Sequence, residues 1–427
     1  MSLTGDLIDL VWDKPVRPAD LSAACSYVLD AMSCAVAARH TGTGQILAAW
    51  AEEGGSGVLV DTFRVAGLVH VLEIDDLHRG SVTHPGCVVV PGAWAVARSL
   101  GRDGRSFLEA VLRGYEVMAR VGASVGPAHY RLWHNTATCG PFGGAAAAGS
   151  LWDLDRERMV WSLGNAGTQA SGLWEFLADG SMSKPLHAAR AAEAGVTSAG
   201  LARRGFSGPA KVLEGERGFY RAMCPDPSPG RLGEDPKGPW ALRCTSIKPW
   251  PSCRHTHPAI HAALELHQAV GAATVRGVTV ETYEAALALC DRSEPASESD
   301  AKFSLQYCVL TALREGAVDL ASFGEETRRR YGRGGTEVRV VASPEFQAGY
   351  PERWGARVTL ELNGGERLTA ERRACLGDPE MPVGEADLRA KARLLLQHGG
   401  MESEEAETFM AEVLGLAHAE HLPPLPA

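Results

Sequence analysis

The chain has 427 residues, of which 45% are hydrophobic and 22% are charged. These proportions are those of ordinary folded proteins and exclude a disordered or fibrous class, and the length predicts two domains. The 42 Lys and Arg residues against 52 Asp and Glu residues give a net charge of −10, with no long basic run. This charge argues against nucleic acid and against an anionic membrane surface as partners.

The ten cysteines are scattered along the chain, and no two of them form a Cys-x-x-Cys pair. Their spacing indicates free thiols in a reducing compartment rather than a zinc or iron–sulfur site. No basic and apolar signal segment precedes Asp6, and no uncharged apolar run has the length of a membrane span. We therefore expect a cytoplasmic protein that does not enter a membrane.

The first half of the chain is dominated by Ala, Leu, Val and Gly in segments of helix length, with Gly or Pro between them. It lacks the sustained alternation with a period of two that is typical of strands. The run from Gly143 to Gly149 carries almost no bulky side chains, which predicts a buried helix that other backbones approach closely. Helices are predicted over residues 19–39, 63–76, 85–100, 106–122, 143–152, 155–177 and 188–203.

The pattern changes after His257. Residues 275–281, 337–341 and 357–362 alternate as strands do, the last of them before an Asn-Gly-Gly turn, and residues 303–316 have helical spacing. Helical patterns return after residue 384 and should pack back on the first half. The predicted fold class is mainly α with an α+β second domain. A large all-helical domain comprises residues 1–257 and 385–427, and a smaller α+β lid comprises residues 258–384.

The first polar motif follows a predicted buried helix. Two interpretations are open: a functional site, or a loop in which Asp75 and Asp76 cap helices and His84 simply precedes Pro85. The acidic, imidazole and guanidinium groups of this motif are Glu73, Asp75, Asp76, His78, Arg79 and His84.

The second motif places His134, Thr136 and Thr138 just before the Gly/Ala-rich helix. The amides at the start of that helix favour an anion, which would give His134 a role beside a charged ligand. The alternative is that one of the threonines only caps the helix.

The third motif is Lys184 followed by Pro185. Proline can begin a helix but cannot continue one, so Lys184 should lie at a helix N-terminus. A lysine there opposes the helix dipole and is unfavourable without an anion, although a solvated lysine is the simpler alternative.

The fourth motif is the densest in charge and holds Lys248, Arg254, His255 and His257 close together. We interpret it as an anion-binding segment. The two histidines could also suggest a metal, but neither a His-Glu-x-x-His pattern nor cysteine pairs are present, so no metal is predicted.

These motifs resemble the MmgE/PrpD family, which includes 2-methylcitrate dehydratases, cis-aconitate decarboxylases and iminodisuccinate epimerases. The resemblance covers most of the chain in order. It implies a helical domain built from both chain ends, a smaller α+β lid and usually a homodimer. The segments that carry it are residues 72–86, 134–148, 183–187, 213–219, 248–257 and 303–307.

The resemblance also implies a site at which acid–base and cationic groups converge on a polycarboxylate. Catalytic roles are expected for His84, His134, Lys184, Lys248 and Tyr307. Substrate-binding roles are expected for Glu73, Asp76, Arg254, His255 and His257. Glu73 and Leu77 stand where the decarboxylase pattern has aspartate and threonine.

Chemistry at a carbon next to a carboxylate needs cations for the developing charge and a group that exchanges a proton near neutral pH. Loss of hydroxide gives dehydration, reprotonation from the other face gives epimerisation, and loss of carboxylate gives decarboxylation. We expect a cofactor-free hydro-lyase similar to 2-methylcitrate dehydratase. An iminodisuccinate epimerase, a cis-aconitate decarboxylase and an inactive binding homologue are the alternatives.

Overall fold

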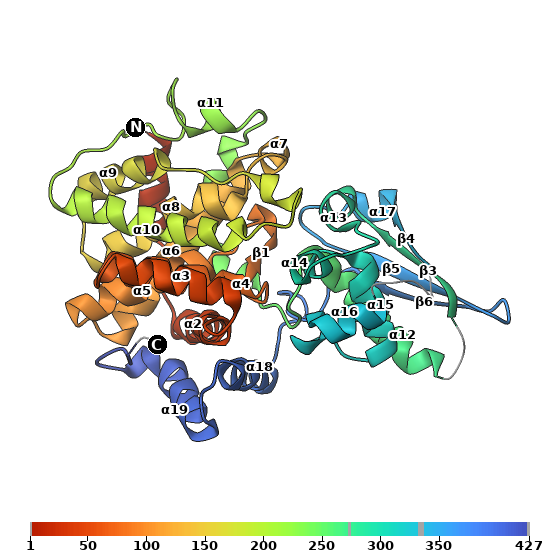
Figure 1. The fold of residues 1–427 in the computed structure, drawn as a ribbon. Coiled ribbons are helices and arrows are strands. Elements are labelled where there is room, and N and C mark those ends of the chain that lie inside the picture. Colours follow the sequence, from red (N-terminus) through yellow and green to blue (C-terminus); the bar gives the residue numbers. More distant parts are fainter. Residues whose placement is uncertain (1, 272–274, 332–336, 425–427) are drawn as a thin grey trace. The chain divides into compact units, whose positions relative to one another are not determined.

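The structure is a computed structural model and describes residues 2–271, 275–331 and 337–424. Its residues form two compact units, which Figure 1 draws with their element labels. The first unit comprises Met1–Ile247 and Gly384–Ala427, and the second comprises Lys248–Val383. The first is helical and the second combines helices with a sheet, so the predicted fold class is confirmed.

Helices make up most of the first unit, with one short antiparallel pair of strands, β1 (Leu77–His78) and β2 (Thr245–Ser246). Its α-helices are α1 (Leu3–Trp12), α2 (Pro18–Ala38), α3 (Gly42–Glu53), α4 (Val58–Val71), α5 (Gly86–Leu100), α6 (Gly104–Ser124), α7 (Pro127–Tyr130), α8 (Asn135–Leu151), α9 (Arg156–Gly167), α10 (Ser183–Arg203), α11 (Phe219–Met223), α18 (Glu385–His398) and α19 (Ser403–Leu414).

Helix α8 lies at the centre of this unit and packs against α6 and α10. A Cβ atom added at Gly143 would lie 2.8 Å from the carbonyl oxygen of Gly114 on α6. One added at Gly195 on α10 would lie 2.7 Å from the backbone nitrogen of Ala145. The small residues therefore allow backbones to approach at distances that side chains would prevent, as the sequence predicted.

Several helix ends differ from the prediction. Helix α8 begins at Asn135 rather than at residue 143, because Pro141 lies inside the helix instead of before it. Helix α4 ends at Val71, and Glu73 then takes a positive φ of 59°, which no helix continues through. Helix α9 ends at Gly167 rather than at residue 177. The acidic residues after α4 consequently lie in a loop.

The C-terminal helices α18 and α19 pack against α2 (Figure 1). Lys391 of α18 joins two parts of the unit, because its Nζ lies 2.5 Å from Oδ1 of Asp30 and 2.8 Å from the carbonyl oxygen of Ile74. Among the described residues, α2 alone is both long and apolar enough to cross a membrane. Since 78% of its apolar window is buried inside the unit, α2 has the environment of a core helix.

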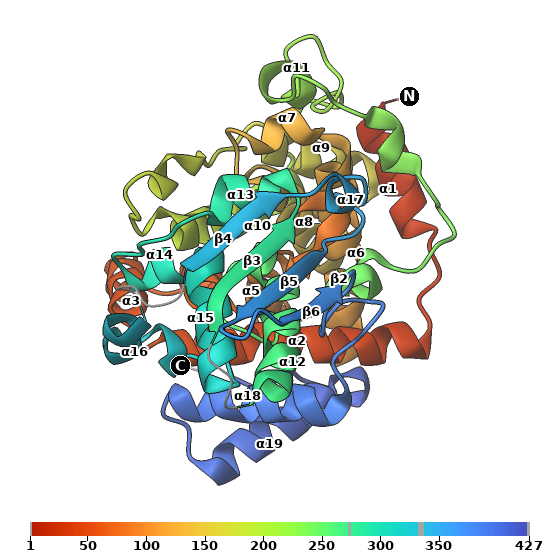
Figure 2. The same ribbon diagram turned by 90° about the vertical axis from the view of Figure 1, so that its right-hand side faces the viewer.

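The second unit contains a four-stranded sheet in the order β4-β3-β5-β6, seen face on in Figure 2. Strands β3 and β4 are parallel and the other neighbours are antiparallel. Alternate residues of β5 are buried, because one face of the sheet packs against α12 while α15 contacts β4. The strands are β3 (Val275–Thr282), β4 (Glu337–Ala342), β5 (Ala356–Leu362) and β6 (Arg367–Arg372). The helices are α12 (His257–Val270), α13 (Glu284–Cys290), α14 (Glu298–Lys302), α15 (Leu305–Glu315), α16 (Glu325–Tyr331) and α17 (Pro344–Gln347).

Residues 248–257 fall in the second unit, whereas the sequence analysis placed them in the helical domain. Hydrogen bonds explain this correction. The backbone N–H of Cys253 donates to the carbonyl oxygen of Lys302 at 2.9 Å. Nδ1 of His255 lies 2.7 Å from the hydroxyl of Tyr283. These long-range partners cannot be read from local sequence.

Candidate active site

A loop after α4 carries three buried carboxylates of the first motif. Glu73, Asp75 and Asp76 are 6%, 0% and 2% exposed. The apolar neighbours Leu72 and Ile74 are also buried, so the loop is held inside the unit. Buried carboxylates need partners, and each of the three has a different one.

Asp75 lies between two imidazoles. Its Oδ2 is 2.7 Å from Nδ1 of His70 and 3.5 Å from Nδ1 of His84. Nδ1 of His84 also donates to the carbonyl oxygen of Asp76 at 2.6 Å. Burial raises the pKa of Asp75, but the two imidazoles outweigh it and hold that pKa well below the ordinary value. Asp75 is therefore an ionised carboxylate at neutral pH.

Asp76 accepts hydrogen bonds from a backbone amide and a tyrosine instead. Its Oδ1 accepts a hydrogen bond from the first amide of α5, at Gly86, at 2.9 Å, and its Oδ2 accepts one from the Tyr115 hydroxyl at 2.6 Å. Burial raises the pKa of Asp76 to about 8, against the opposing effect of the Tyr115 hydrogen bond. These contacts are those of the helix-capping alternative left open by the sequence.

His134 is the N-cap residue of α8 and is 1% exposed. Its Nδ1 is 3.3 Å from Nδ1 of His187, and its Nε2 has no hydrogen-bond partner among the described residues. Its ring stacks on that of His70, with centroids 5.7 Å apart. Burial, then the charge of Lys184 and the neighbouring imidazoles, lower the pKa of His134 well below 6.5. At neutral pH it is an uncharged imidazole.

Lys184 lies in the first turn of α10, at a helix N-terminus as predicted. Its ammonium is buried and lies 2.6 and 2.5 Å from the two carboxylate oxygens of Glu73. The anion that compensates this lysine in the structure is thus the side chain of Glu73, which was predicted to bind substrate. Removing either partner would leave a buried charge.

Three site residues, His70, His187 and Trp174, were not predicted from the sequence. His70 is buried within the apolar helix α4, and its only signal was its position one to two turns before Asp75. His187 lies one turn after Lys184 on α10, and burial lowers its pKa to about 4. The Trp174 ring is 4.7 Å from that of His134. Together with His84 and His134, the two missed histidines form a cluster of four imidazoles.

Two residues of the fourth motif are engaged inside the second unit. Arg254 forms a buried ion pair with Asp378. The His255 ring stacks on Trp354 with centroids 4.2 Å apart and an interplanar angle of 4°. These contacts give both residues a role in packing the second unit.

The other predicted residues of this unit are also buried. Lys248 and His257 are both 0% exposed, and Nε2 of His257 lies 3.2 Å from the carbonyl oxygen of Ser252. The Tyr307 hydroxyl donates to the carbonyl oxygen of Ser322 at 2.6 Å, and burial raises the pKa of Tyr307 to about 12. The structure brings Glu73, His84, His134 and Lys184 together in the first unit. Convergence of the second unit's residues on the same substrate stays a prediction.

His70, Asp75 and His84 also meet the distance requirement of a metal site, with one possible ligand atom each within 4.8 Å of the others. The hydrogen bonds argue for a proton-holding cluster instead. Nδ1 of His84 faces a carbonyl oxygen at 2.6 Å and Nδ1 of His70 faces an ionised carboxylate at 2.7 Å. Both nitrogens must carry hydrogen, so neither is available as a ligand through that atom.

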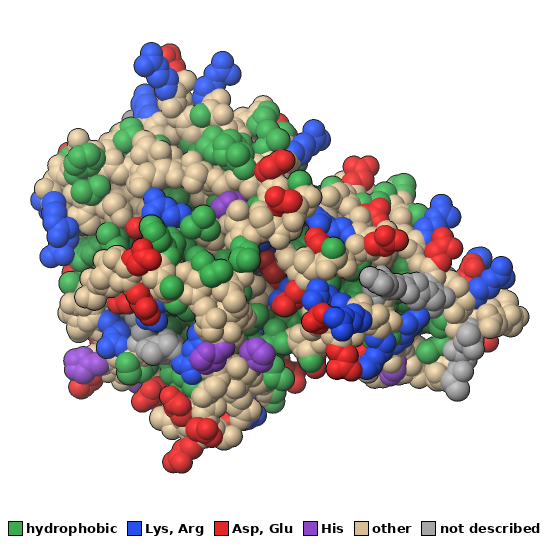
Figure 3. Space-filling view, in the orientation of Figure 1, with side chains coloured by type: hydrophobic (Ala, Val, Ile, Leu, Met, Phe, Trp, Pro, Cys, Tyr) green, Lys and Arg blue, Asp and Glu red, His purple; other side chains and the backbone are tan. Residues whose placement is uncertain are grey.

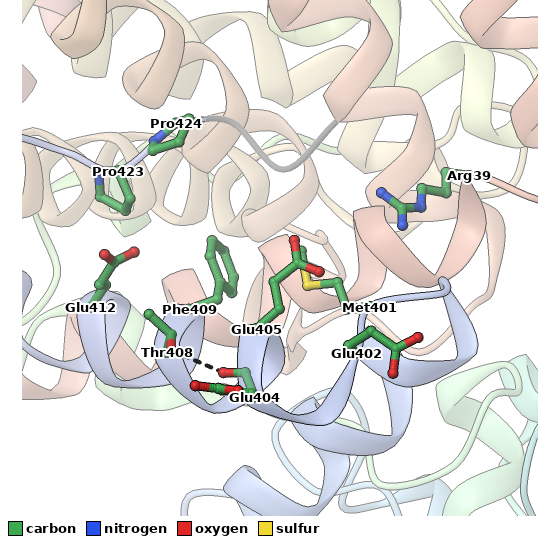
Figure 4. Close-up of a pocket in the computed structure, with 10 residues that line it drawn as sticks. All are labelled: Arg39, Met401, Glu402, Glu404, Glu405, Thr408, Phe409, Glu412, Pro423 and Pro424. Carbon is green, nitrogen blue, oxygen red and sulfur yellow. Dashed lines mark hydrogen bonds between the residues drawn. The ribbon is translucent and has the colours of Figure 1, made fainter.

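A surface cavity of about 690 Å³ lies elsewhere in the first unit, between α19, Arg39 and the C-terminal segment (Figure 4). Four glutamates line it, including Glu404, Glu405 and Glu412. Their charge opposes an anionic substrate, so this cavity does not fit the predicted polycarboxylate.

On the face drawn in Figure 3, Lys and Arg side chains are interspersed with Asp and Glu.

Comparison with known proteins shows relatives along most of the chain. Human cis-aconitate decarboxylase is 27% identical over 350 residues, which cover 76% of this chain and 70% of the relative. The cis-aconitate decarboxylase of Aspergillus terreus is 25% identical over 393 residues, 84% of this chain and 79% of the relative. The 2-methylcitrate dehydratase of Salmonella typhimurium is 30% identical over 155 residues, 33% and 30% of the two chains.

The sequences of both units match domains of one known family. Residues 14–232 match the MmgE/PrpD N-terminal domain, and residues 250–416 match the MmgE/PrpD C-terminal domain. The helical unit with its imidazole cluster and the α+β unit that follows it therefore belong to one protein of the MmgE/PrpD family.

Proposed function

We propose that the protein is a lyase that acts on a small di- or tricarboxylate by moving a proton at a carbon next to a carboxylate. The observation that carries this proposal is His134, a buried and uncharged imidazole whose Nε2 has no partner among the described residues. An uncharged imidazole nitrogen can accept a proton, and nearby Lys184 supplies positive charge.

The residues of the first unit have separable roles in this proposal. Nε2 of His134 takes the proton, and the Lys184 ammonium stabilises the negative charge that develops on the substrate carboxylate. His84 acts as the second acid–base group through Nε2, because its Nδ1 donates to the carbonyl oxygen of Asp76. Substrate binding requires Glu73 to share or release Lys184, since Glu73 holds both short contacts to its ammonium.

Decarboxylation is the first candidate outcome, because the decarboxylase relatives match most of the chain. Dehydration is the second, and two observations favour it. A dehydratase relative is 30% identical over its shorter match. Leu77, which stands where the decarboxylase pattern has threonine, is buried in β1 and offers no hydroxyl to a substrate.

The deciding experiment is incubation of the protein in deuterated water with cis-aconitate, citrate, 2-methylcitrate and an aminodicarboxylate, followed by NMR. Release of carbon dioxide identifies a decarboxylase and loss of water identifies a dehydratase. Deuterium exchange without either identifies an epimerase. If none of the four compounds changes, while the protein is folded, the proposed function is wrong for these substrates.

We further propose that the protein works as a homodimer, as the family resemblance implies, and that it is cytoplasmic and needs no metal or organic cofactor, as the cysteine spacing and the cationic residues suggest. Light scattering measures the oligomeric state. Metal analysis and turnover after treatment with a chelator test the cofactor. Stoichiometric metal whose removal abolishes turnover would contradict this part of the proposal.

A further inference from the structure

We propose that Asp75 and His70 are positioning residues of the proton transfer: they hold the ring of His84 with Nε2 as its proton-exchanging atom, and His70 packs against His134. The inference rests on the proposed function and adds two residues that the sequence did not assign to it. Neither residue needs to touch substrate for this role.

The hydrogen bond to Asp75 decides which nitrogen of His70 carries hydrogen. Its Nδ1 lies 2.7 Å from Oδ2 of Asp75 and both groups are fully buried. An ionised carboxylate only accepts hydrogen bonds, so Nδ1 of His70 carries the hydrogen. Nε2 of His70 has no hydrogen-bond partner among the described residues. Asp75 is thus the side chain that fixes the orientation of this ring.

A hydrogen bond likewise decides which nitrogen of His84 carries hydrogen. The carbonyl oxygen of Asp76, at 2.6 Å, requires hydrogen on Nδ1 of His84. The Asp75 carboxylate lies 3.5 Å from the same nitrogen and faces the positive charge that appears when Nε2 takes a proton. A carboxylate beside an imidazole in this arrangement both orients the ring and stabilises its protonated form.

His70 packs between the two acid–base candidates. Its ring meets His84 edge to face, with centroids 4.7 Å apart, and stacks on His134 with an interplanar angle of 13°. A change in the His70 ring would therefore alter the surroundings of both imidazoles.

Charged and titratable groups surround this pair, among them Asp30 of α2, which acts on Asp76 and Lys391. Asp75 is influenced by His84 and Asp76 in its own loop, Cys87 of α5 and Lys391 of α18. His70 is close to His134 at the start of α8 and acts on His187 of α10. Of the two adjacent carboxylates Asp75 and Asp76, Asp75 is the ionised one, because burial raises the pKa of Asp76 to about 8.

The proton transfer that follows is balanced within these groups. In dehydration or epimerisation the C–H bond of the substrate breaks, its electron pair stays on carbon as an enediolate, and the proton binds Nε2 of His134 or His84. In decarboxylation the C–C bond breaks instead, carbon dioxide leaves, and a protonated imidazole gives its Nε2 proton to carbon. Whenever His84 holds the proton, its imidazolium faces the Asp75 carboxylate, which stays ionised throughout. The proton returns to carbon or leaves with the departing group, and the imidazole is uncharged again.

The test uses the full chain labelled with [15N]histidine, and His70→Gln and His84→Gln variants assign the two signals by their disappearance. NMR of the substrate-free protein, recorded above the titration midpoints of both rings, should show hydrogen on Nδ1 alone in each ring. The Asp75→Asn variant should lower the titration midpoint of His84 by about 1–3 pH units, the effect of losing one nearby opposite charge. It should also lower kcat about 10–100-fold with little change in KM.

The matched control is Glu116→Gln, which removes another buried carboxylate of the same unit, one paired with Lys14 and Arg120 rather than with an imidazole. It should lower the melting temperature and leave the His84 midpoint unchanged.

Hydrogen on Nε2 of His84, or an Asp75→Asn midpoint equal to wild type, overturns the inference whatever the activity. If Asp75→Asn does not fold, the tautomers of His70 and His84 in the wild-type protein are the test of the inference. If both rings carry hydrogen on Nδ1 and Asp75→Asn shifts the His84 midpoint, but the wild-type protein turns over none of the compounds, the proposed function is wrong and the positioning role stands.

Discussion

The two units contain similar sequence signals, histidines close to basic residues, that the structure uses differently. In the helical unit, His134 is a buried uncharged ring with an unpartnered Nε2 among the described residues. In the α+β unit, Arg254 pairs with Asp378 and His255 stacks on Trp354. Density of charge in sequence is therefore a weaker guide to chemistry than an acid–base atom that folding leaves without a partner.

The largest expected effect concerns His134. His134→Gln keeps much of the size and polarity of the side chain but removes the titrating ring, so turnover should fall by about 10²–10⁴. The melting temperature should change less than turnover does, since Gln fills much of the space beside His70 and Trp174 and the hydrogen-bond contact of the ring, from Nδ1 to His187, is 3.3 Å long.

His129→Gln is the matched control for His134→Gln. His129 is also buried, but both of its ring nitrogens are engaged, with the Met223 carbonyl oxygen and the Thr138 hydroxyl at 2.8 Å each. This variant should lose stability and keep its turnover per folded molecule. The reverse pattern in the two variants would remove His134 from the mechanism.

The next effect concerns the buried ion pair of the helical unit. Lys184→Met should lower turnover by about 10²–10³ because a cation at the reacting carboxylate is lost. It should also reduce the free energy of unfolding by about 3–5 kcal/mol, since Glu73 is left as an uncompensated buried charge.

The double variant Glu73→Gln/Lys184→Met separates these two effects. Denaturant unfolding should show most of the stability restored, because no buried charge remains, while turnover stays low. Recovery of turnover in the double variant would show that Lys184 acts only by neutralising Glu73.

In the α+β unit, a substitution in the buried ion pair of Arg254 and Asp378 should lower stability without lowering turnover. Arg254→Met leaves Asp378 buried without its cation and should destabilise the protein by about 3–5 kcal/mol. Steady-state turnover, corrected for the folded fraction, should stay within a few-fold of wild type. A loss comparable to that of Lys184→Met would restore the predicted substrate-binding role of Arg254 and end the contrast between the units.

Local sequence patterns were sufficient to predict the fold class. Apolar segments of helix length in the first half and alternation at residues 275–281 and 357–362 both correspond to observed elements. The start of α8 was missed because tertiary packing accommodates Pro141 inside a helix. The end of α4 depends on the positive φ of Glu73, which the buried loop imposes and the local sequence does not signal.

The candidate site was predictable only in part. His84, His134 and Lys184 stood out because each interrupts or begins a helical pattern. His70 did not, because a histidine within an apolar helix has the same local pattern whether or not it meets a carboxylate. The partner of Arg254 is 124 residues away in the chain, so its ion pair could not be inferred from spacing. Pairing over such separations is decided by the fold.

The smallest expected effect concerns Asp76 and appears in the pH dependence of stability. Its pKa is raised to about 8 in the folded protein, so between about pH 4 and pH 8 the folded state binds a proton that the unfolded state has released. The free energy of unfolding therefore falls as pH rises through this window. Asp76→Asn keeps an acceptor for the Gly86 amide and carries no charge at any pH. The free energy of unfolding of the variant, minus that of wild type, should therefore be larger at pH 8 than at pH 5. Thermal unfolding at the two pH values measures this difference. Turnover per folded molecule should stay close to wild type, since Asp76 contacts Gly86 and Tyr115. If the variant differs from wild type in free energy of unfolding by the same amount at both pH values, Asp76 is ionised like Asp75. The distinction between the two neighbouring carboxylates would then be wrong.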